Sequence, residues 1–114
     1  MCDSWIHATG PMSQRGTDGS NQSEALISQC LAAVAQGEYS GYFDLGVAFS
    51  TGSHGVECDF VEAHKWFNLA AVAGIVEAQA CRAEISDEMT AREIAEAQRR
   101  ARQWIAATSA RRAA

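Results

Sequence analysis

Lysine, proline and long apolar runs are all scarce in this sequence. Its 114 residues include one proline and a single lysine, Lys65, and no apolar run approaches the roughly 20 residues that span a bilayer. The first ten residues, MCDSWIHATG, lack the basic segment and apolar stretch of a secretory signal. We therefore expect a cytoplasmic protein without membrane contact. The near absence of proline and the 47% hydrophobic content suit a globular, mostly helical chain.

The sequence also lacks the short motifs of common enzyme classes. It has no HExxH, no phosphate-binding glycine loop before a lysine and no Ser-x-x-Lys. We therefore expect no enzymatic activity, no catalytic residues and no cofactor. The one cluster that resembles a metal site is His54, Cys58, Asp59 and His64, with a histidine-x3-cysteine spacing in its first part. This spacing matches no zinc pattern strongly, so a metal-dependent enzyme or binder is the alternative hypothesis.

The four cysteines, Cys2, Cys30, Cys58 and Cys81, contain no CxxC pair. In a cytoplasmic chain this pattern favours reduced thiols over disulfides. We expect four free thiols without a bound metal, with Cys30 and Cys81 at buried helix positions.

Charge is divided unevenly along the chain. Fourteen acidic and four basic residues precede Gln98, whereas five arginines and no acidic residue follow it. A negatively charged body makes nucleic-acid binding unlikely as the main function, because such binding needs clustered positive charge. The arginines from Arg99 to Arg112 are typical of the end of a terminal helix, where they offset the helix dipole. Polyanion binding by this C-terminus is the alternative.

Composition and periodicity divide the chain into three parts. Residues 1–22 are rich in glycine, serine, asparagine and glutamine without an apolar period, which predicts a flexible leader. Residues 23–108 are expected to form a helical domain, and residues 109–114 a basic tail. Apolar spacing and capping residues predict five helices in an all-α domain: Ser23 to Gly37, about 43–49, Asp59 to Gly74, about 75–85, and one capped by Thr90 with Glu93 that carries apolar residues to Ile105.

An internal period of 38 residues links three of these helices. The pentapeptide LAAVA occurs at residues 31–35 and 69–73, and Ala25, Ala63 and Ala101 have the same spacing. Trp66 and Trp104 are also 38 residues apart. Self-similarity at this length is typical of helical repeats that stack on one another. We expect both tryptophans to be buried at equivalent positions.

Residues 41–79, GYFDLGVAFSTGSHGVECDFVEAHKWFNLAAVAGIVEAQ, resemble one repeat of the Sel-one-like repeat family. Gly41 stands where that family usually has alanine, and the loop GSHGV has one extra residue; we expect both departures to be tolerated at a helix start and a surface loop. Ala101 and Trp104 extend the pattern into the last helix. The matching residues are Leu45, Gly46, Phe49, Gly52, Gly55, Val56, Asp59, Ala63, Trp66, Ala70, Ala71, Gly74, Ala78 and Gln79.

The resemblance implies a short α/α solenoid similar to tetratricopeptide arrays, with half a repeat followed by two helix pairs. It also implies an adaptor or scaffold that binds a protein segment on a grooved face. In such arrays the first helix of each pair lines the concave side, so the predicted partner-binding residues are Tyr39, Tyr42, Asp44, Gln79 and Arg82. His64 and Lys65 lie between apolar positions of the third helix. We expect them at the surface, where a partner on the convex side is the alternative.

Overall fold

The computed structural model describes residues 16–113, with side chains from 22 to 109, and this part of the chain contains five α-helices and no strand. The expected all-α fold is confirmed. No helix in the described part is long and apolar enough to cross a membrane. The helices are α2 (Gly16–Ala35), α3 (Ser40–Thr51), α4 (Phe60–Val72), α5 (Val76–Ser86) and α6 (Ala91–Ala113).

The two terminal helices are longer than the sequence pattern predicts. α2 begins at Gly16, inside the expected flexible leader, and α6 continues to Ala113, through most of the expected tail. Both extensions consist mainly of polar or small residues, so they carry no apolar period by which the sequence could reveal them. The rest of the expected leader, residues 1–15, lies outside the described residues.

Capping residues fix the starts of α4 and α6 as expected. The Asp59 carboxylate accepts hydrogen bonds from the backbone N–H groups of Val61, at 3.0 Å, and Glu62, at 3.2 Å. At α6, the Thr90 hydroxyl accepts from the Glu93 N–H while the Glu93 carboxylate accepts from the Thr90 N–H. These bonds satisfy N–H groups that have no partner within the helix.

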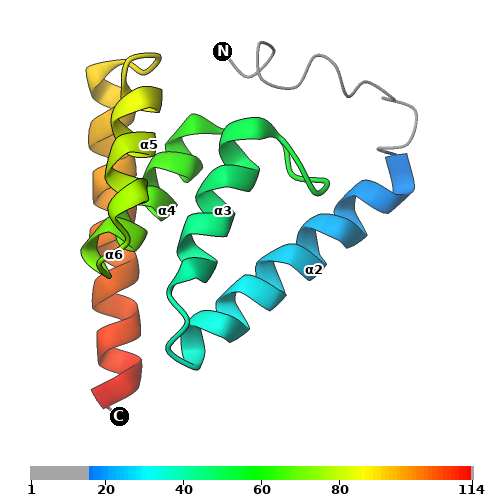
Figure 1. Ribbon diagram of the computed structural model, residues 1–114, viewed down its shortest axis with the longest axis horizontal. Coiled ribbons are helices and arrows are strands. Elements are labelled where there is room, and N and C mark those ends of the chain that lie inside the picture. Colours follow the sequence, from blue (N-terminus) through cyan, green and yellow to red (C-terminus); the bar gives the residue numbers. More distant parts are fainter. Residues whose placement is uncertain (1–15, 114) are drawn as a thin grey trace.

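α4 is the central helix of the molecule (Figure 1). It packs against α3, α5 and α6, whereas α2 makes its main contacts with α3 and diverges from the other helices. The largest fully buried side chains are Phe67 on α4, Leu45 on α3 and Ile85 on α5. Alanines with almost no exposed surface lie between the helices and allow a close approach: Ala63, Ala70, Ala78, Ala97 and Ala101.

Two glycines of α3 bring its neighbours close. A Cβ added to Gly46 would lie 2.5 Å from the Phe67 ring, so α3 and α4 approach through the missing side chain. At Gly41 an added Cβ would collide with the backbone carbonyl of Cys30 on α2. Glycine at position 41 is thus more than tolerated: the approach of α2 requires it, because backbone atoms cannot move aside as a flexible side chain can.

Candidate interaction surfaces and the α4–α6 contact

The equivalent tryptophans meet where α4 packs on α6. The Trp66 and Trp104 rings are 5.1 Å apart in an edge-to-face arrangement, and Trp66 also stacks on Tyr42 of α3 at 5.8 Å. Tyr39 continues the row, at 6.2 Å from Tyr42. Trp66 is buried, as expected, while Trp104 is only half-buried. Four aromatic side chains therefore join three helices through one row of rings.

The polar atoms of Tyr42, Trp66 and Trp104 in this row are satisfied within the chain. Trp104 Nε1 donates to the Tyr42 hydroxyl at 2.9 Å, and Trp66 Nε1 donates to Glu62 Oε1 at 3.2 Å. Buried rings with paired polar tips stabilise a core and offer few free donors to a ligand. The row is therefore a structural contact between α3, α4 and α6.

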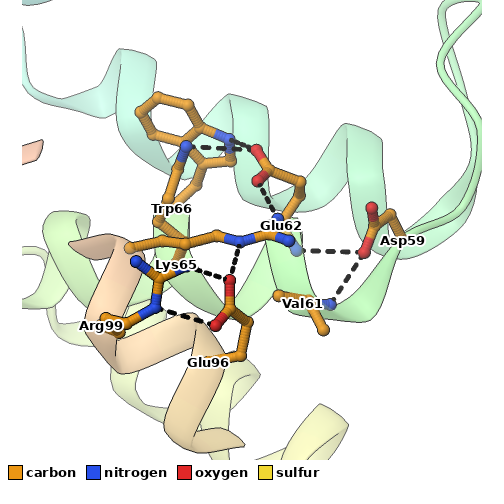
Figure 2. Close-up of polar contacts among 8 residues, drawn as sticks. Asp59, Val61, Glu62, Lys65, Trp66, Glu96 and Arg99 are labelled. Atoms are coloured by element: carbon orange, nitrogen blue, oxygen red, sulfur yellow. Dashed lines mark hydrogen bonds and ion pairs between the residues drawn. The ribbon is translucent and has the colours of Figure 1, made fainter. Parts of the chain in front are cut away.

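Ion pairs surround the same contact (Figure 2). Glu62 on α4 binds the guanidinium of Arg100 on α6 at 2.6 Å and the ammonium of Lys65 at 3.2 Å. The Lys65 ammonium also lies 4.0 Å from the centre of the Trp66 ring, a cation–π contact. Glu62 and Arg100 stand 38 residues apart in the sequence, as Trp66 and Trp104 do. Equivalent residues of successive segments thus contact each other.

Glu96 anchors the α6 side of this network. It binds Arg99 at 2.6 Å and Arg100 at 2.7 Å. Hydrogen bonds from Arg99 and then Arg100 lower the pKa of the Glu96 carboxyl to about 2, and the pKa of both arginines is raised by the same contacts. Two of the five arginines on which the polyanion alternative depends are thus occupied by carboxylates, while the side chains of Arg111 and Arg112 lie outside the described residues.

The predicted partner-binding residues fall into two groups. Asp44 and Gln79 are exposed, as a binding surface requires. Tyr42 is only 8% exposed and belongs to the core, so the expectation that it lies off the packing face is wrong. The ring turns toward α4 because Trp66 and the Trp104 N–H offer it both apolar area and a hydrogen bond. Tyr39 and Arg82 are half-buried, and Arg82 donates to Asn68 of α4 at 2.6 Å.

His64 and Lys65 are also covered, contrary to expectation. The Lys65 side chain is 12% exposed, and His64 is 3% exposed with no hydrogen-bond partner for its buried Nδ1. Burial, followed by the charge of Arg82, lowers the pKa of His64 from its ordinary value of 6.5. Three helices surround α4, so positions between its apolar residues are enclosed as well. These two residues therefore form no exposed convex surface.

The residues of the metal hypothesis are not gathered into one site. His54 lies exposed in the loop before α4 and contacts the Ser53 hydroxyl, whereas His64 is buried one turn into α4. In the described part of the chain, no three histidine, cysteine, aspartate or glutamate side chains are grouped to hold a metal ion. Cys30 and Cys81 are free thiols. Cys58 is disulfide-bonded, which contradicts the expectation of four free thiols, and Cys2 lies outside the described residues.

Exposed residues of α3 and α5, which define what we call the outer sides of these helices, include some that sequence reasoning missed. Besides Asp44 and Gln79 these are Val47, which is 37% exposed, Val76, which is 73% exposed, and the carboxylates of Glu77 and Glu84. An alignment of α3 with α5 could have revealed them, because Gly41 and Ala78 each follow a helix-ending glycine by four residues. In that alignment Ser40 corresponds to Glu77, and Val47 corresponds to Glu84.

The chain matches no family model, and no significant match was found for it among curated proteins or among solved structures. The resemblance to Sel-one-like repeats therefore remains an interpretation of its own residues.

Proposed function

We propose that this chain is a non-enzymatic protein-interaction module, a short α/α repeat array of the Sel-one-like kind. Support comes from the contacts between residues 38 positions apart, Glu62 with Arg100 and Trp66 with Trp104. Stacked repeats bring equivalent residues of successive units together in this way. Its role is that of an adaptor or scaffold.

The main support for this proposal is that some acidic side chains stabilise the fold, whereas others are exposed without such a contact. Asp59 and Glu93 cap helices, and Glu62 and Glu96 form ion pairs. In contrast, several exposed carboxylates have no ion pair or hydrogen bond to another described residue, and three of them, Asp44, Glu77 and Glu84, lie on α3 and α5. Exposed side chains that do not contribute to folding are available to a partner.

Apolar residues lie next to these carboxylates. Val47 on α3 and Val76 on α5 are two of only four large apolar side chains that are exposed in the described part of the chain. Apolar contact supplies most of the free energy of protein association, while charged neighbours select the partner. We propose that a protein segment binds the outer sides of α3 and α5, with Asp44 and Gln79 among its contacts.

A capture experiment tests this function. The full-length protein is immobilised, binding proteins from the source cell are identified, and the affinity of the main partner is measured for wild type and for Asp44→Ala with Gln79→Ala. We expect binding to weaken about tenfold, or ~1.4 kcal/mol, at an unchanged melting temperature. The matched control is Glu24→Ala with Glu57→Ala, two exposed residues elsewhere. Equal affinities for wild type and the Asp44 variant would reject the assigned surface.

A further inference from the structure

The equivalence of α4 and α6 in the 38-residue period indicates that α6 has an uncovered side suited to bind another helix. On α4, positions 64 and 68 face α5: Asn68 accepts a hydrogen bond from Arg82 of α5, and the charge of the same arginine acts on buried His64. The offset of 38 that relates Glu62 to Arg100 places Arg102 and Ala106 at the corresponding positions of α6. Both residues are exposed. Between them, Ile105 exposes 40% of its surface.

This α6 side, defined by Arg102, Ile105 and Ala106, is positively charged. Arg102 has no ion pair or hydrogen bond to another described residue, and no acidic residue follows Gln98 in the sequence. Its neighbours Arg99 and Arg100 are held by Glu96 and Glu62. A helix that covers this side must therefore bring acidic residues together with some apolar area.

The outer side of α5 has this composition. It carries Glu77 and Glu84, two turns apart, with the exposed Val76 beside them. The two carboxylates are close enough to act on the thiol between them, since burial and then Glu84 and Glu77 raise the pKa of Cys81. The only basic residue of α5, Arg82, is bonded to Asn68. The α5 outer side is therefore negatively charged, without an ion-pair partner among residues 22–109.

We propose that the α6 side of one copy of this protein binds the α5 outer side of a second copy. Arg102 meets the Glu77 and Glu84 carboxylates, and Ile105 packs near Val76. The two surfaces differ, so the contact is head-to-tail and leaves a free surface of each kind at the ends of a dimer. This inference rests on the proposed function, because it treats the α5 outer side as a protein-binding surface and names an occupant for it.

Sedimentation of the full-length protein over a range of concentrations tests this contact. We expect self-association that weakens as salt is raised, because exposed charge pairs are screened. Arg102→Glu and Glu84→Arg should each weaken association about tenfold or more, and an equimolar mixture of the two variants should associate again through the reversed pair. Arg92→Glu and Glu24→Arg make the same changes of charge at other exposed positions and should leave association unchanged.

Three results would overturn the proposal. These are a monomer at every concentration, association that survives both charge reversals, and failure of the mixed variants to associate although each alone keeps the melting temperature of wild type. The result of the capture experiment is interpreted independently of the sedimentation result. If the Asp44 and Gln79 variant loses its partner while the protein remains monomeric, the proposed function stands and the second copy is excluded as the occupant of α5.

Discussion

At the scale of single residues, Tyr42 shows how one side chain can join three helices. Its ring stacks on Trp66 of α4 while its hydroxyl accepts a hydrogen bond from Trp104 of α6. The tyrosine itself lies on α3. A partner could reach this side chain only by separating the helices, so changes at position 42 should act on stability.

Removal of the Tyr42 hydroxyl should leave the Trp104 N–H without its partner. We expect Tyr42→Phe to lower the free energy of unfolding by about 1–2 kcal/mol, and Tyr42→Ala to lower it by about 3–5 kcal/mol because the ring contacts are lost as well. Urea unfolding followed by tryptophan fluorescence measures both. Tyr39→Phe is the control, since no hydrogen bond of the Tyr39 hydroxyl is present in the described structure. An unchanged stability of Tyr42→Ala would place the ring outside the core.

His64 should make stability depend on pH. Its pKa in the folded protein is lowered by burial and by Arg82, so the unfolded state binds more protons between the ordinary value of 6.5 and the folded value. The free energy of unfolding should therefore fall as the pH drops through this window, and level off below the folded pKa. Glu96, whose pKa is lowered to about 2, loses its contribution only at lower pH.

The variant His64→Leu isolates this effect, because Leu26 occupies the equivalent position of α2. Urea midpoints measured between about pH 7.5 and about pH 5 should change less in His64→Leu than in wild type. His54→Leu, at an exposed position, serves as the control and should keep the wild-type slope. Parallel pH profiles for wild type and His64→Leu would show that His64 does not control the dependence.

At the scale of helices, the contact between α4 and α6 is the main structural consequence of the 38-residue period. Glu62 and Arg100 join the two helices beside the tryptophan pair. The ion pair is partly exposed, with side-chain exposures of 21% and 36%. Its contribution to stability is therefore modest and sensitive to salt.

A double-mutant cycle measures this contact. Glu62→Ala, Arg100→Ala and the double variant should show a coupling of about 0.5–1 kcal/mol, which decreases at high salt. The same cycle with Glu24 in place of Glu62 should show none, since Glu24 lies on α2. A coupling close to zero for Glu62 with Arg100 would mean that these equivalent positions do not support each other.

The existence of the helices and their caps could be predicted from the sequence, but the direction of several side chains could not. Apolar spacing and the Asp59 and Thr90 caps are local signals, and they predicted all five helices. The burial of His64 and Tyr42 depends on how many neighbours surround α4 and α3, which a pattern of one apolar face does not contain. The effect of Gly41 likewise depends on the approach of a distant backbone, the Cys30 carbonyl.

At the scale of the whole molecule, some acidic and basic side chains of the described part pair with each other, and others have no ion-pair partner there. The α4–α6 contact uses Glu62, Glu96 and Arg100 internally, whereas the outer sides of α3 and α5 keep their carboxylates and valines exposed. This distribution is the basis for assigning a binding function to those two helices.

Hydrogen exchange of the full-length protein, alone and bound to its captured partner, tests this assignment most directly. We expect partner binding to slow exchange in α3 and α5 more than in the loop of residues 52–59, because a segment on their outer sides shields these helices and suppresses their opening. Unchanged exchange in α3 and α5, with protection confined to the loop or to α6, would contradict the account.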